Sequence, residues 1–243
     1  MTYLSIIIPA HNEAARIQGS LEKIRQYLRW RADQSNIKLG GAEVIVVENG
    51  STDNTAELVR EFQAQQIWPQ IKLIRQAVGD KGRAVKAGML AASGKYRYMA
   101  DADLSTPIEQ LGKFLRYAGD LRADVVIGNR AQVENQTLAR SIMSLGFKAA
   151  ANITLGFPPY SDTQAGFKLF TAEAAEQLFP RLRVFGWAFD VEILLLAQRL
   201  RYRVVELPIP WRREAGSQVN AAVPFRMLLD LARIKRAHNE ITL

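Results

Sequence analysis

The stretch Tyr98-Met-Ala-Asp101-Ala-Asp103-Leu-Ser-Thr-Pro107 ends an apolar run in two carboxylates with one small residue between them. Because a strand sends alternate side chains to the same face, Asp101 and Asp103 can point together where the strand ends. Two carboxylates this close repel each other unless a cation lies between them. Oxygen ligands that leave room for water suit Mg²⁺ or Mn²⁺ bound together with a phosphate, so the stretch indicates a metal site. The alternative is structural: Asp103 starts a turn and caps the helix that Pro107 opens.

Four strand–loop–helix units in a row lead up to this stretch. Continuous apolar runs predict buried strands at 4–8, at 42–47, at 71–74 and up to Met99. Apolar residues at helical spacing predict helices at 13–31, around 58–62 and at 84–92. This order predicts an α/β fold with an open, mostly parallel central sheet and helices on both faces.

Ligands of such sheets bind outside the carboxyl ends of the strands. That rule gathers four polar segments along one edge, namely 9–13, 48–53, 79–82 and 101–103. Four polar loops at one edge predict a nucleotide cleft. The sequence contains neither GxGxxG nor GxxxxGK[ST], which argues against a dinucleotide-binding fold and against a P-loop enzyme.

The second half of the chain is less regular, but it shows no linker, repeat or low-complexity segment. Strands are expected at 124–130, 166–170 and 204–209, and Pro208 places the last of them at an edge of the sheet. Helices are expected at 140–152, 172–178 and 189–200. The sequence therefore predicts a single domain over residues 1–243.

The composition limits the classes of site and partner. With no cysteine and two histidines, thiolate sites are excluded and zinc sites have little scope, so any metal must be held by oxygen. The net charge of +8 favours an anionic partner, but no nucleic-acid motif accompanies it, so nucleic acid is not expected. No apolar stretch reaches membrane-spanning length and no basic leader precedes the first strand, so a cytoplasmic protein is expected.

Six segments in order resemble the motifs of the family 2 glycosyltransferases with the GT-A fold, and more narrowly their dolichyl-phosphate β-glucosyltransferase and dolichol-phosphate mannose synthase branch. The segments are Ile8-Pro-Ala-His-Asn-Glu13, Val46-Val-Glu-Asn-Gly-Ser-Thr-Asp53, Lys81-Gly-Arg-Ala-Val-Lys-Ala-Gly88, Asp101-Ala-Asp-Leu-Ser-Thr-Pro107, Asp162-Thr-Gln-Ala-Gly-Phe-Lys168 and Trp211-Arg-Arg-Glu-Ala-Gly-Ser217. Each segment alone is a weak signal, whereas six in the right order are a strong one.

The resemblance implies a nucleotide-sugar donor, a UDP- or GDP-hexose, and a divalent cation. By position, the donor contacts are Pro9, Ala10, His11, Glu13, Val47, Asn49, Lys81, Asp101, Ala102 and Asp103. The resemblance makes Asp101 and Asp103 the catalytic pair and the ligands of Mg²⁺ or Mn²⁺ at the diphosphate. A cation there stabilises the charge that develops on the leaving group.

Two donor positions depart from the family pattern. His11 stands where a tyrosine is usual, and Asn49 stands where an aspartate usually bonds the base. An amide can donate or accept, so the choice of base stays open. Structural alternatives also stay open, because Pro9 can simply end a strand and Lys81 can simply be a solvated charge.

The resemblance further implies inverting transfer of a hexose, glucose or mannose, to a polyprenyl or dolichyl monophosphate. Such a phosphate is already ionised, so it needs cations to hold it and no general base. The residues that fall at this phosphate by position are Arg130, Arg140, Arg212, Arg213 and Ser217. On this interpretation residues 1–107 bind the nucleotide sugar and residues 108–243 bind the acceptor.

Two other classes of function stay open. If the acceptor were a soluble or glycolipid hydroxyl, a general base would be required, and Asp190 or Glu192 would be the candidates. A binding protein without activity is the third class, and the intact pair of Asp101 and Asp103 argues against it.

A chain that acts on a lipid-borne phosphate must reach a membrane surface, and the C-terminal segment 224–238 offers a means. It is expected to form a helix whose apolar side carries Met227, Leu228, Leu231 and Ile234, while Arg226, Asp230, Arg233 and Arg236 follow another side. Such a helix can lie in a bilayer interface, which would make the protein peripheral at the cytoplasmic face of the membrane. It can equally pack on the domain's own core.

Overall fold

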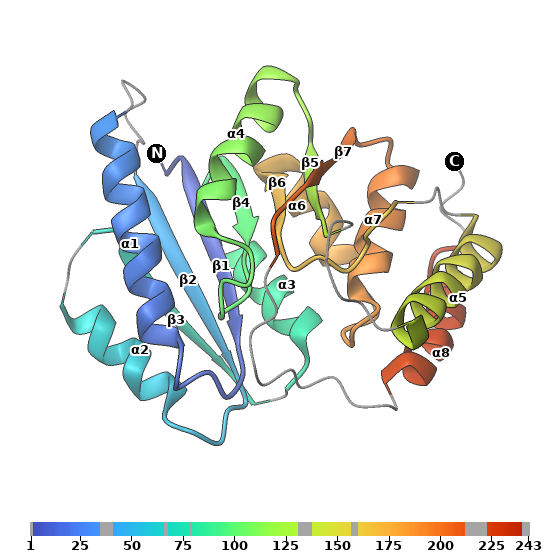
Figure 1. Cartoon of the computed structure of the whole chain (residues 1–243), viewed down its shortest axis with the longest axis horizontal. Coiled ribbons are helices and arrows are strands. Elements are labelled where there is room, and N and C mark those ends of the chain that lie inside the picture. Colours follow the sequence, from blue (N-terminus) through green and yellow to red (C-terminus); the bar gives the residue numbers. More distant parts are fainter. Residues whose placement is uncertain are drawn as a thin grey trace.

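The computed structural model describes residues 2–34, 41–65, 68–77, 79–130, 138–156, 160–211 and 223–239. Seven strands form one sheet in the order β3-β2-β1-β4-β6-β5-β7 (Figure 1). Their bounds are β1 (Leu4–Ala10), β2 (Ala42–Asn49), β3 (Gln70–Gln76), β4 (Tyr96–Met99), β5 (Val125–Asn129), β6 (Lys168–Thr171) and β7 (Val204–Pro208).

The sheet is mostly parallel, as predicted. β1 pairs parallel with β2 and β4, β2 with β3, and β5 with β7. β6 is the exception, because it pairs antiparallel with both β4 and β5. β7 lies at an edge of the sheet and ends at Pro208, which confirms the position predicted from that proline.

Helices cover both faces of the sheet, as predicted (Figure 1). The α-helices are α1 (Ile17–Gln34), α2 (Thr55–Ala64), α3 (Lys81–Ala91), α4 (Leu111–Asp120), α5 (Leu138–Leu155), α6 (Ala172–Leu178), α7 (Phe189–Arg199) and α8 (Val223–Ala237). Two 3-10 helices, η1 (Ile108–Gln110) and η2 (Phe179–Arg181), adjoin α4 and α6.

The hydrophobic core has two parts, one on each face of the sheet. Alternate residues of β1 divide between them: Ile6 joins the cluster under α1, α2 and α4, and Ile7 joins the cluster under α3, α6 and α7. A strand buried on both faces favours apolar residues on both sides, which explains the continuous apolar runs in the sequence.

α1 begins at Ile17 and not at residue 13 as predicted. The difference has a physical cause, because polar side chains of the loop after β2 satisfy the main-chain donors of residues 12–14. The N–H groups of Asn12, Glu13 and Ala14 donate to Ser51 Oγ, Thr55 Oγ1 and Asp53 Oδ2. These bonds hold the loop after β1 against the loop after β2.

α3 packs so closely on the sheet that a side chain at Gly88 would collide with it. A Cβ added at Gly88 would lie 2.4 Å from Cγ2 of Ile7. Glycine at this position lets the helix sit low on the sheet, and its first residue, Lys81, therefore lies at the edge where the parallel strands end.

The prediction that Met227, Leu228, Leu231 and Ile234 together face a membrane is wrong. Met227, Leu231 and Ile234 are buried in the core on the α3 face, and of the four predicted apolar residues only Leu228 is exposed. α8 therefore packs on the core, the alternative that the sequence left open. His238, just after the helix, is also buried, and its Nε2 lies 2.6 Å from Oε1 of Glu192. Within the part of the chain that the structure describes, no helix is long and apolar enough to cross a membrane.

At the amino ends of the strands, opposite the candidate site, a buried carboxylate ties β1, β2 and β3 together. Glu43 lies 2.6 Å from Lys72 Nζ and accepts hydrogen bonds from Ser5 and Ser93. Burial by itself raises the pKa of Glu43, but these partners outweigh burial and lower it from 4.5 to about 2.

Replacing Glu43 with glutamine should therefore change how stability depends on pH. The folded pKa lies below the unfolded one, so the contribution is complete above pH 4.5 and is lost as pH falls toward 2. That difference corresponds to at most about 3 kcal/mol. We expect Glu43→Gln to be less stable at pH 7 in urea denaturation and to lose less stability than the parent between pH 5 and pH 2. Parallel curves for the two proteins over that range would contradict the assignment.

Candidate functional site

Asp101 follows the end of β4, and the start of β6 lies directly against it. β4 and β6 pair antiparallel with Met99 opposite Lys168. Continuing this register past the strand ends sets Asp101 opposite Gly166. A Cβ added at Gly166 would lie 1.9 Å from Oδ2 of Asp101, so only glycine fits there. The antiparallel strand thus fixes one side of the Asp101 carboxylate.

Lys81 holds the other side of that carboxylate. Its Nζ donates a 2.7 Å hydrogen bond to Oδ1 of Asp101, and solvent reaches both side chains, which are 24% and 26% exposed. Burial by itself raises the pKa of Asp101, but the Lys81 ammonium outweighs burial and holds that pKa below its usual range. The ring of Trp187 lies 5.8 Å from Lys81 Nζ, close enough for a cation–π contact. Asp101 is therefore ionised and already paired with a cation.

Asp103 and Glu13 bring further negative charge to this edge. Oδ1 of Asp103 accepts a 2.9 Å hydrogen bond from the N–H of Ser105, so the turn of the structural alternative is present, but the 3-10 helix that follows has no side-chain cap. Burial raises the pKa of Glu13, and the charges of Asp103 and Asp101 add to the rise in spite of Arg16. Among the described residues, no three His, Cys, Asp or Glu lie close enough to hold a metal. Any divalent cation at this edge would therefore need oxygen ligands from outside the described side chains.

The loops after β1 and β2 meet as the sheet-edge rule predicts. His11 Nδ1 lies 2.8 Å from the main-chain oxygen of Asn49, and a Cβ at Gly79 would lie 3.7 Å from His11 Cε1. The side chain of Asn49 is buried, and within the described ranges no hydrogen-bond partner reaches its Oδ1. A buried amide oxygen without a partner costs free energy, which a ligand donor would recover.

Other predicted donor contacts lie deeper in the structure. The side chains of Ala10, Val47 and Ala102 are buried in the core, so these residues can meet a ligand only through main-chain atoms. Pro9 is half-buried near the end of β1. Alternation along the strands explains this result, because consecutive residues cannot all face the cleft.

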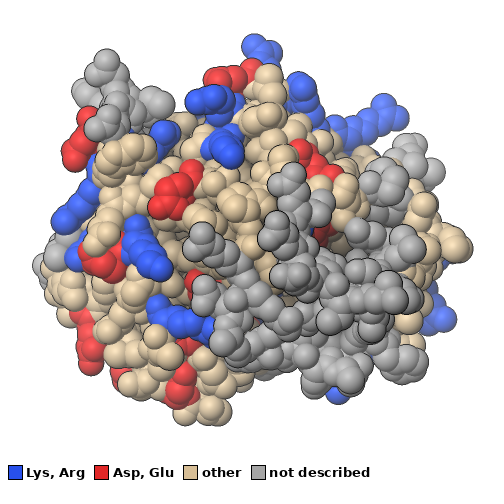
Figure 2. Space-filling view, in the orientation of Figure 1, with Lys and Arg blue, Asp and Glu red and all other residues tan. Residues whose placement is uncertain are grey.

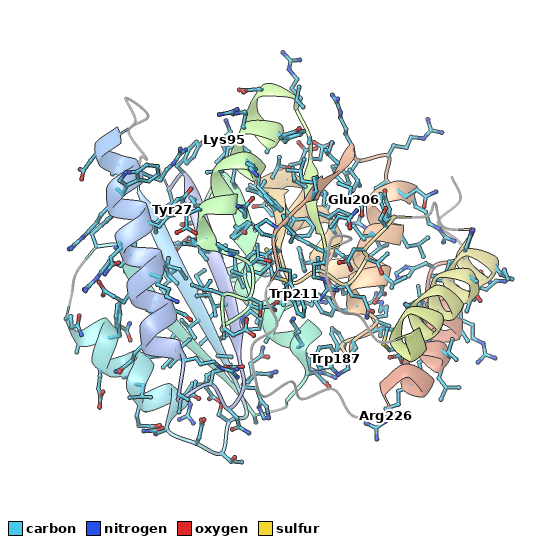
Figure 3. The ribbon with its side chains drawn as sticks, viewed as in Figure 1. Tyr27, Lys95, Trp187, Glu206, Trp211 and Arg226 are labelled. Atoms are coloured by element: carbon cyan, nitrogen blue, oxygen red, sulfur yellow. The ribbon has the colours of Figure 1, made fainter. Side chains whose placement is uncertain are left out.

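A second cation of the site, Arg130, follows the end of β5 and is held by Asp162. The guanidinium makes two hydrogen bonds to the carboxylate, of 2.6 and 3.0 Å, and the main-chain N–H of Arg130 donates a third. Glu206 in turn accepts from the N–H of Asp162. The ring of Trp211 lies 5.6 Å from the guanidinium carbon, and Figure 3 shows Trp211 and Trp187 near the middle of the molecule. Arg130 is thus a cation held in a fixed orientation after the end of β5.

The other four predicted acceptor contacts are not placed. The side chain of Arg140, on α5, lies outside the described part of the structure. Arg212, Arg213 and Ser217 lie in a segment, 212–222, that is also outside it.

A buried ion pair joins the first residue of β6 to α7. Lys168 Nζ lies 2.6 Å from Oδ1 of Asp190, and both side chains are nearly inaccessible. Burial raises the pKa of Asp190 in spite of Lys168 and Lys81.

Glu192 is fully buried and accepts hydrogen bonds from the N–H groups of Arg183 and Val184. It therefore has a structural role in this arrangement, and Asp190 is occupied by Lys168. Because both carboxylates are buried and have partners, neither is available as a free general base.

Sequence reasoning assigned no role to Gly166, Asp162, Lys168 or Trp187. The first three lie in a motif that was quoted for its resemblance alone. Their roles depend on the pairing of β6 with β4 and β5, and sequence periodicity carries no information about which distant strand pairs with which. Trp187 could have been noticed as a large aromatic residue just before α7. Its contact with Lys81, however, joins distant segments and cannot be inferred from the sequence.

Comparison with known proteins gives one family. The model of glycosyl transferase family 2 matches residues 5–179. A dolichyl-phosphate beta-glucosyltransferase of Trichomonas vaginalis is 38% identical over 242 residues, which cover 96% of this chain and 70% of the relative. The enzyme of that name from Saccharomyces cerevisiae is 34% identical, with 97% and 75% covered, and the human one is 31% identical, with 95% and 72% covered.

Solved structures with the same fold are more distant in sequence. Glucosyl-3-phosphoglycerate synthase of Mycobacterium tuberculosis, in complex with phosphoglyceric acid, matches with a TM-score of 0.68 at 18% identity, covering 96% of this chain and 80% of that one. Mannosyl-3-phosphoglycerate synthase of Rubrobacter xylanophilus matches with 0.68 at 16% identity, covering 98% and 74%. The mycobacterial enzyme with Mn²⁺, UDP-glucose and glycerol 3-phosphate matches with 0.65 at 16% identity, covering 96% and 80%. At these identities the matches show the fold alone, which is GT-A.

The buried pair of Lys168 and Asp190 can be tested by stability measurements. Lys168→Met leaves a carboxylate without its cation in the interior, and we expect a loss of about 3–5 kcal/mol at pH 7 in urea denaturation. The loss should be smaller at pH 5. In the folded variant the pKa of Asp190 is raised, so Asp190 takes up a proton as pH falls and the folded state then no longer holds an unpaired buried charge. The double variant Lys168→Met/Asp190→Leu should recover most of the loss. A double variant less stable than Lys168→Met would contradict this account.

Proposed function

The chain belongs to glycosyl transferase family 2, and from that premise we propose that it transfers glucose from UDP-glucose to a polyprenyl or dolichyl monophosphate, with inversion and with a divalent cation. That it is a glycosyltransferase follows from the family and from the relatives that cover most of its length. The observation that carries the finer proposal is that these relatives are dolichyl-phosphate beta-glucosyltransferases at 31–38% identity. The proposed division is donor binding by residues 1–107 and acceptor binding by residues 108–243.

The donor would lie along the edge formed by the loops after β1, β2 and β4. The buried Oδ1 of Asn49 has no hydrogen-bond donor among the described residues, and uracil offers one at N3–H. A distant structural neighbour binds UDP-glucose, which is consistent with uracil as the base. Lys81 lies at the start of α3, where a diphosphate would gain from both the ammonium and the helix terminus.

Asp103 and Asp101 are the residues that would hold the cation, with water and the diphosphate of the donor as its other ligands. When bound, Mg²⁺ or Mn²⁺ would neutralise the charge that develops on the departing diphosphate. The role of this chain's own residues is to fix the two carboxylates. Gly166 and Lys81 do so for Asp101, and the N–H of Ser105 does so for Asp103.

The acceptor phosphate would be held by Arg130. Two of its guanidinium nitrogens are used by Asp162, which fixes the plane of the group beside the cleft. An ionised phosphate needs no base, and this agrees with a site in which Asp190 and Glu192 are engaged elsewhere. Because the phosphate attacks once, an α-linked donor gives a β-linked product, as the names of the relatives state for their own products.

The direct test is transfer with defined substrates. With Mg²⁺ or Mn²⁺, we expect glucose to pass from UDP-glucose to a polyprenyl phosphate, and proton NMR of the product to show a β linkage. GDP-mannose and 3-phosphoglycerate serve as the competing donor and acceptor. An α-linked product would exclude single displacement, and preference for 3-phosphoglycerate would exclude the lipid acceptor.

Two glycine variants make a matched control for this assay. Gly166→Ala must displace the Asp101 carboxylate, and a shift of about 1 Å at a reacting centre can reduce turnover by about 100-fold. Gly146→Ala, at an exposed position of α5, meets nothing within 4 Å and should leave transfer unchanged. Equal activity of the two variants would show that Asp101 is not part of the reacting centre.

A lipid acceptor requires contact with a membrane surface, and we propose that the outer side of α8 provides it. With the inner side buried, the outward side presents Leu228 and Leu229, which are 45% and 50% exposed, and the cations Arg233, Lys235 and Arg236. On the face seen in Figure 2, lysine and arginine are interspersed with acidic residues, and several of them lie along its upper edge. Cations beside exposed leucines suit anionic lipid.

The protein should therefore sediment with phosphatidylserine vesicles at low salt and be released at high salt. Each cation near the surface contributes about 1 kcal/mol, so Lys235→Glu/Arg236→Glu should reduce binding at least about 30-fold. Lys113→Glu/Arg116→Glu, on α4, makes the same change of net charge elsewhere and should bind nearly as well as the parent. Equal loss by both double variants would indicate a general charge effect and not this helix.

A further inference from the structure

The carboxylate of Asp101 has a cation at Oδ1 and the main chain of Gly166 against Oδ2. Lys81 Nζ lies 2.7 Å from Oδ1, and the backbone at Gly166 lies against Oδ2 so closely that a Cβ there would be 1.9 Å away. A metal ion that takes the position of the ammonium at Oδ1 must therefore displace it.

Charges around Asp101 are already balanced in pairs. Asp101 is paired with Lys81, Asp162 with Arg130, and Asp190 with Lys168. Asp103 has a hydrogen bond from Ser105 N–H but no ion pair among the described residues. Because Lys81 pairs with Asp101 and Arg16 pairs with Glu13, Asp103 is the carboxylate that a divalent cation could meet here without displacing a side-chain cation of the described part.

Lys81 is able to move. It lies at the N-terminus of α3, it is partly exposed, and its ammonium ends a flexible stem with three donors. Trp187, at 5.8 Å, provides an aromatic face that can accompany the cation without holding it as tightly as a carboxylate. The diphosphate of a nucleotide at the same edge would be a strong alternative partner.

We propose that Lys81 is an exchangeable counterion: in the nucleotide-free protein it neutralises Asp101, and it leaves Asp101 for the diphosphate when the divalent cation and the nucleotide bind together. This inference rests on the proposed function. The exchange leaves each charged group with a partner of opposite sign, because the divalent cation replaces the ammonium at Asp101 and the ammonium meets the anionic phosphates. Its consequence is that the metal alone binds weakly and that metal and nucleotide bind cooperatively.

The test is Mn²⁺ binding followed by electron paramagnetic resonance, with and without UDP. Removing the charge with Lys81→Met frees Asp101, so we expect Mn²⁺ alone to bind at least about tenfold more tightly than to the parent. In the parent, UDP should strengthen Mn²⁺ binding, and by linkage Mn²⁺ should strengthen UDP binding by the same factor. That factor should fall in Lys81→Met, since the phosphates have lost their partner.

Two further variants separate charge from packing. Lys81→Arg keeps the positive charge and should keep Mn²⁺ binding weak in the absence of UDP. Lys86 lies on the same helix, but its ammonium donates to the main-chain oxygens of Pro180 and Leu182 and not to a carboxylate. The variant Lys86→Met should therefore bind Mn²⁺ like the parent. A thermal melt of each variant checks that it is folded.

The outcomes distinguish this inference from the proposed function. If Lys81→Met binds Mn²⁺ no more tightly than the parent while UDP still strengthens binding in the parent, counterion exchange is wrong and metal-dependent donor binding stands. If the parent does not bind Mn²⁺ even with UDP, the metal-dependent function itself fails.

Discussion

The antiparallel strand β6 is the constraint on which the site depends. It enters the sheet at the edge where β4 and β5 leave it, and its register with β4 sets Gly166 against Asp101. The same strand begins with Lys168, whose ammonium reaches Asp190 on α7. A parallel β6 would begin at the opposite edge, and neither contact would form. One reversed strand therefore joins the donor half of the sheet to the half that carries Arg130.

Close pairing of charges gives the site its order. The carboxylates of Asp101, Asp162 and Asp190 each have a cation within hydrogen-bond distance, and the cations come from three different elements, α3, β6 and the segment after β5. Burial disfavours each ionised group by itself, so the pairs hold one another in place. Within this arrangement Asp101 and Lys81 are reached by solvent, whereas Lys168 and Asp190 are not. The inner pair is thus suited to structure and the outer pair to ligand exchange.

The helix α8 packs on the core by one side and leaves the other side to solvent. Its inner side, with Met227, Leu231 and Ile234, completes the core, and a contact of 3.6 Å joins Met227 to Gln164, which also bonds the main chain of Trp187. Its outer side keeps two leucines and several cations in solvent. Gln164 and Trp187 thus connect the inner side of the helix to the surroundings of Lys81.

The sequence by itself determined the α/β class, the mostly parallel sheet, the edge position of β7 and the edge at which Asp101, Asp103, His11 and Asn49 gather. Those features follow from local rules, since the spacing of apolar residues and the positions of prolines and turn residues can be identified in the sequence without any tertiary contact. Only the tertiary structure decided the direction of β6, the contacts of Gly166, Lys168 and Trp187, the structural use of Glu192, and the burial of the inner side of α8. Each of these depends on which distant segments pack together, and packing is set by the energy of the whole fold and not by any one stretch of sequence.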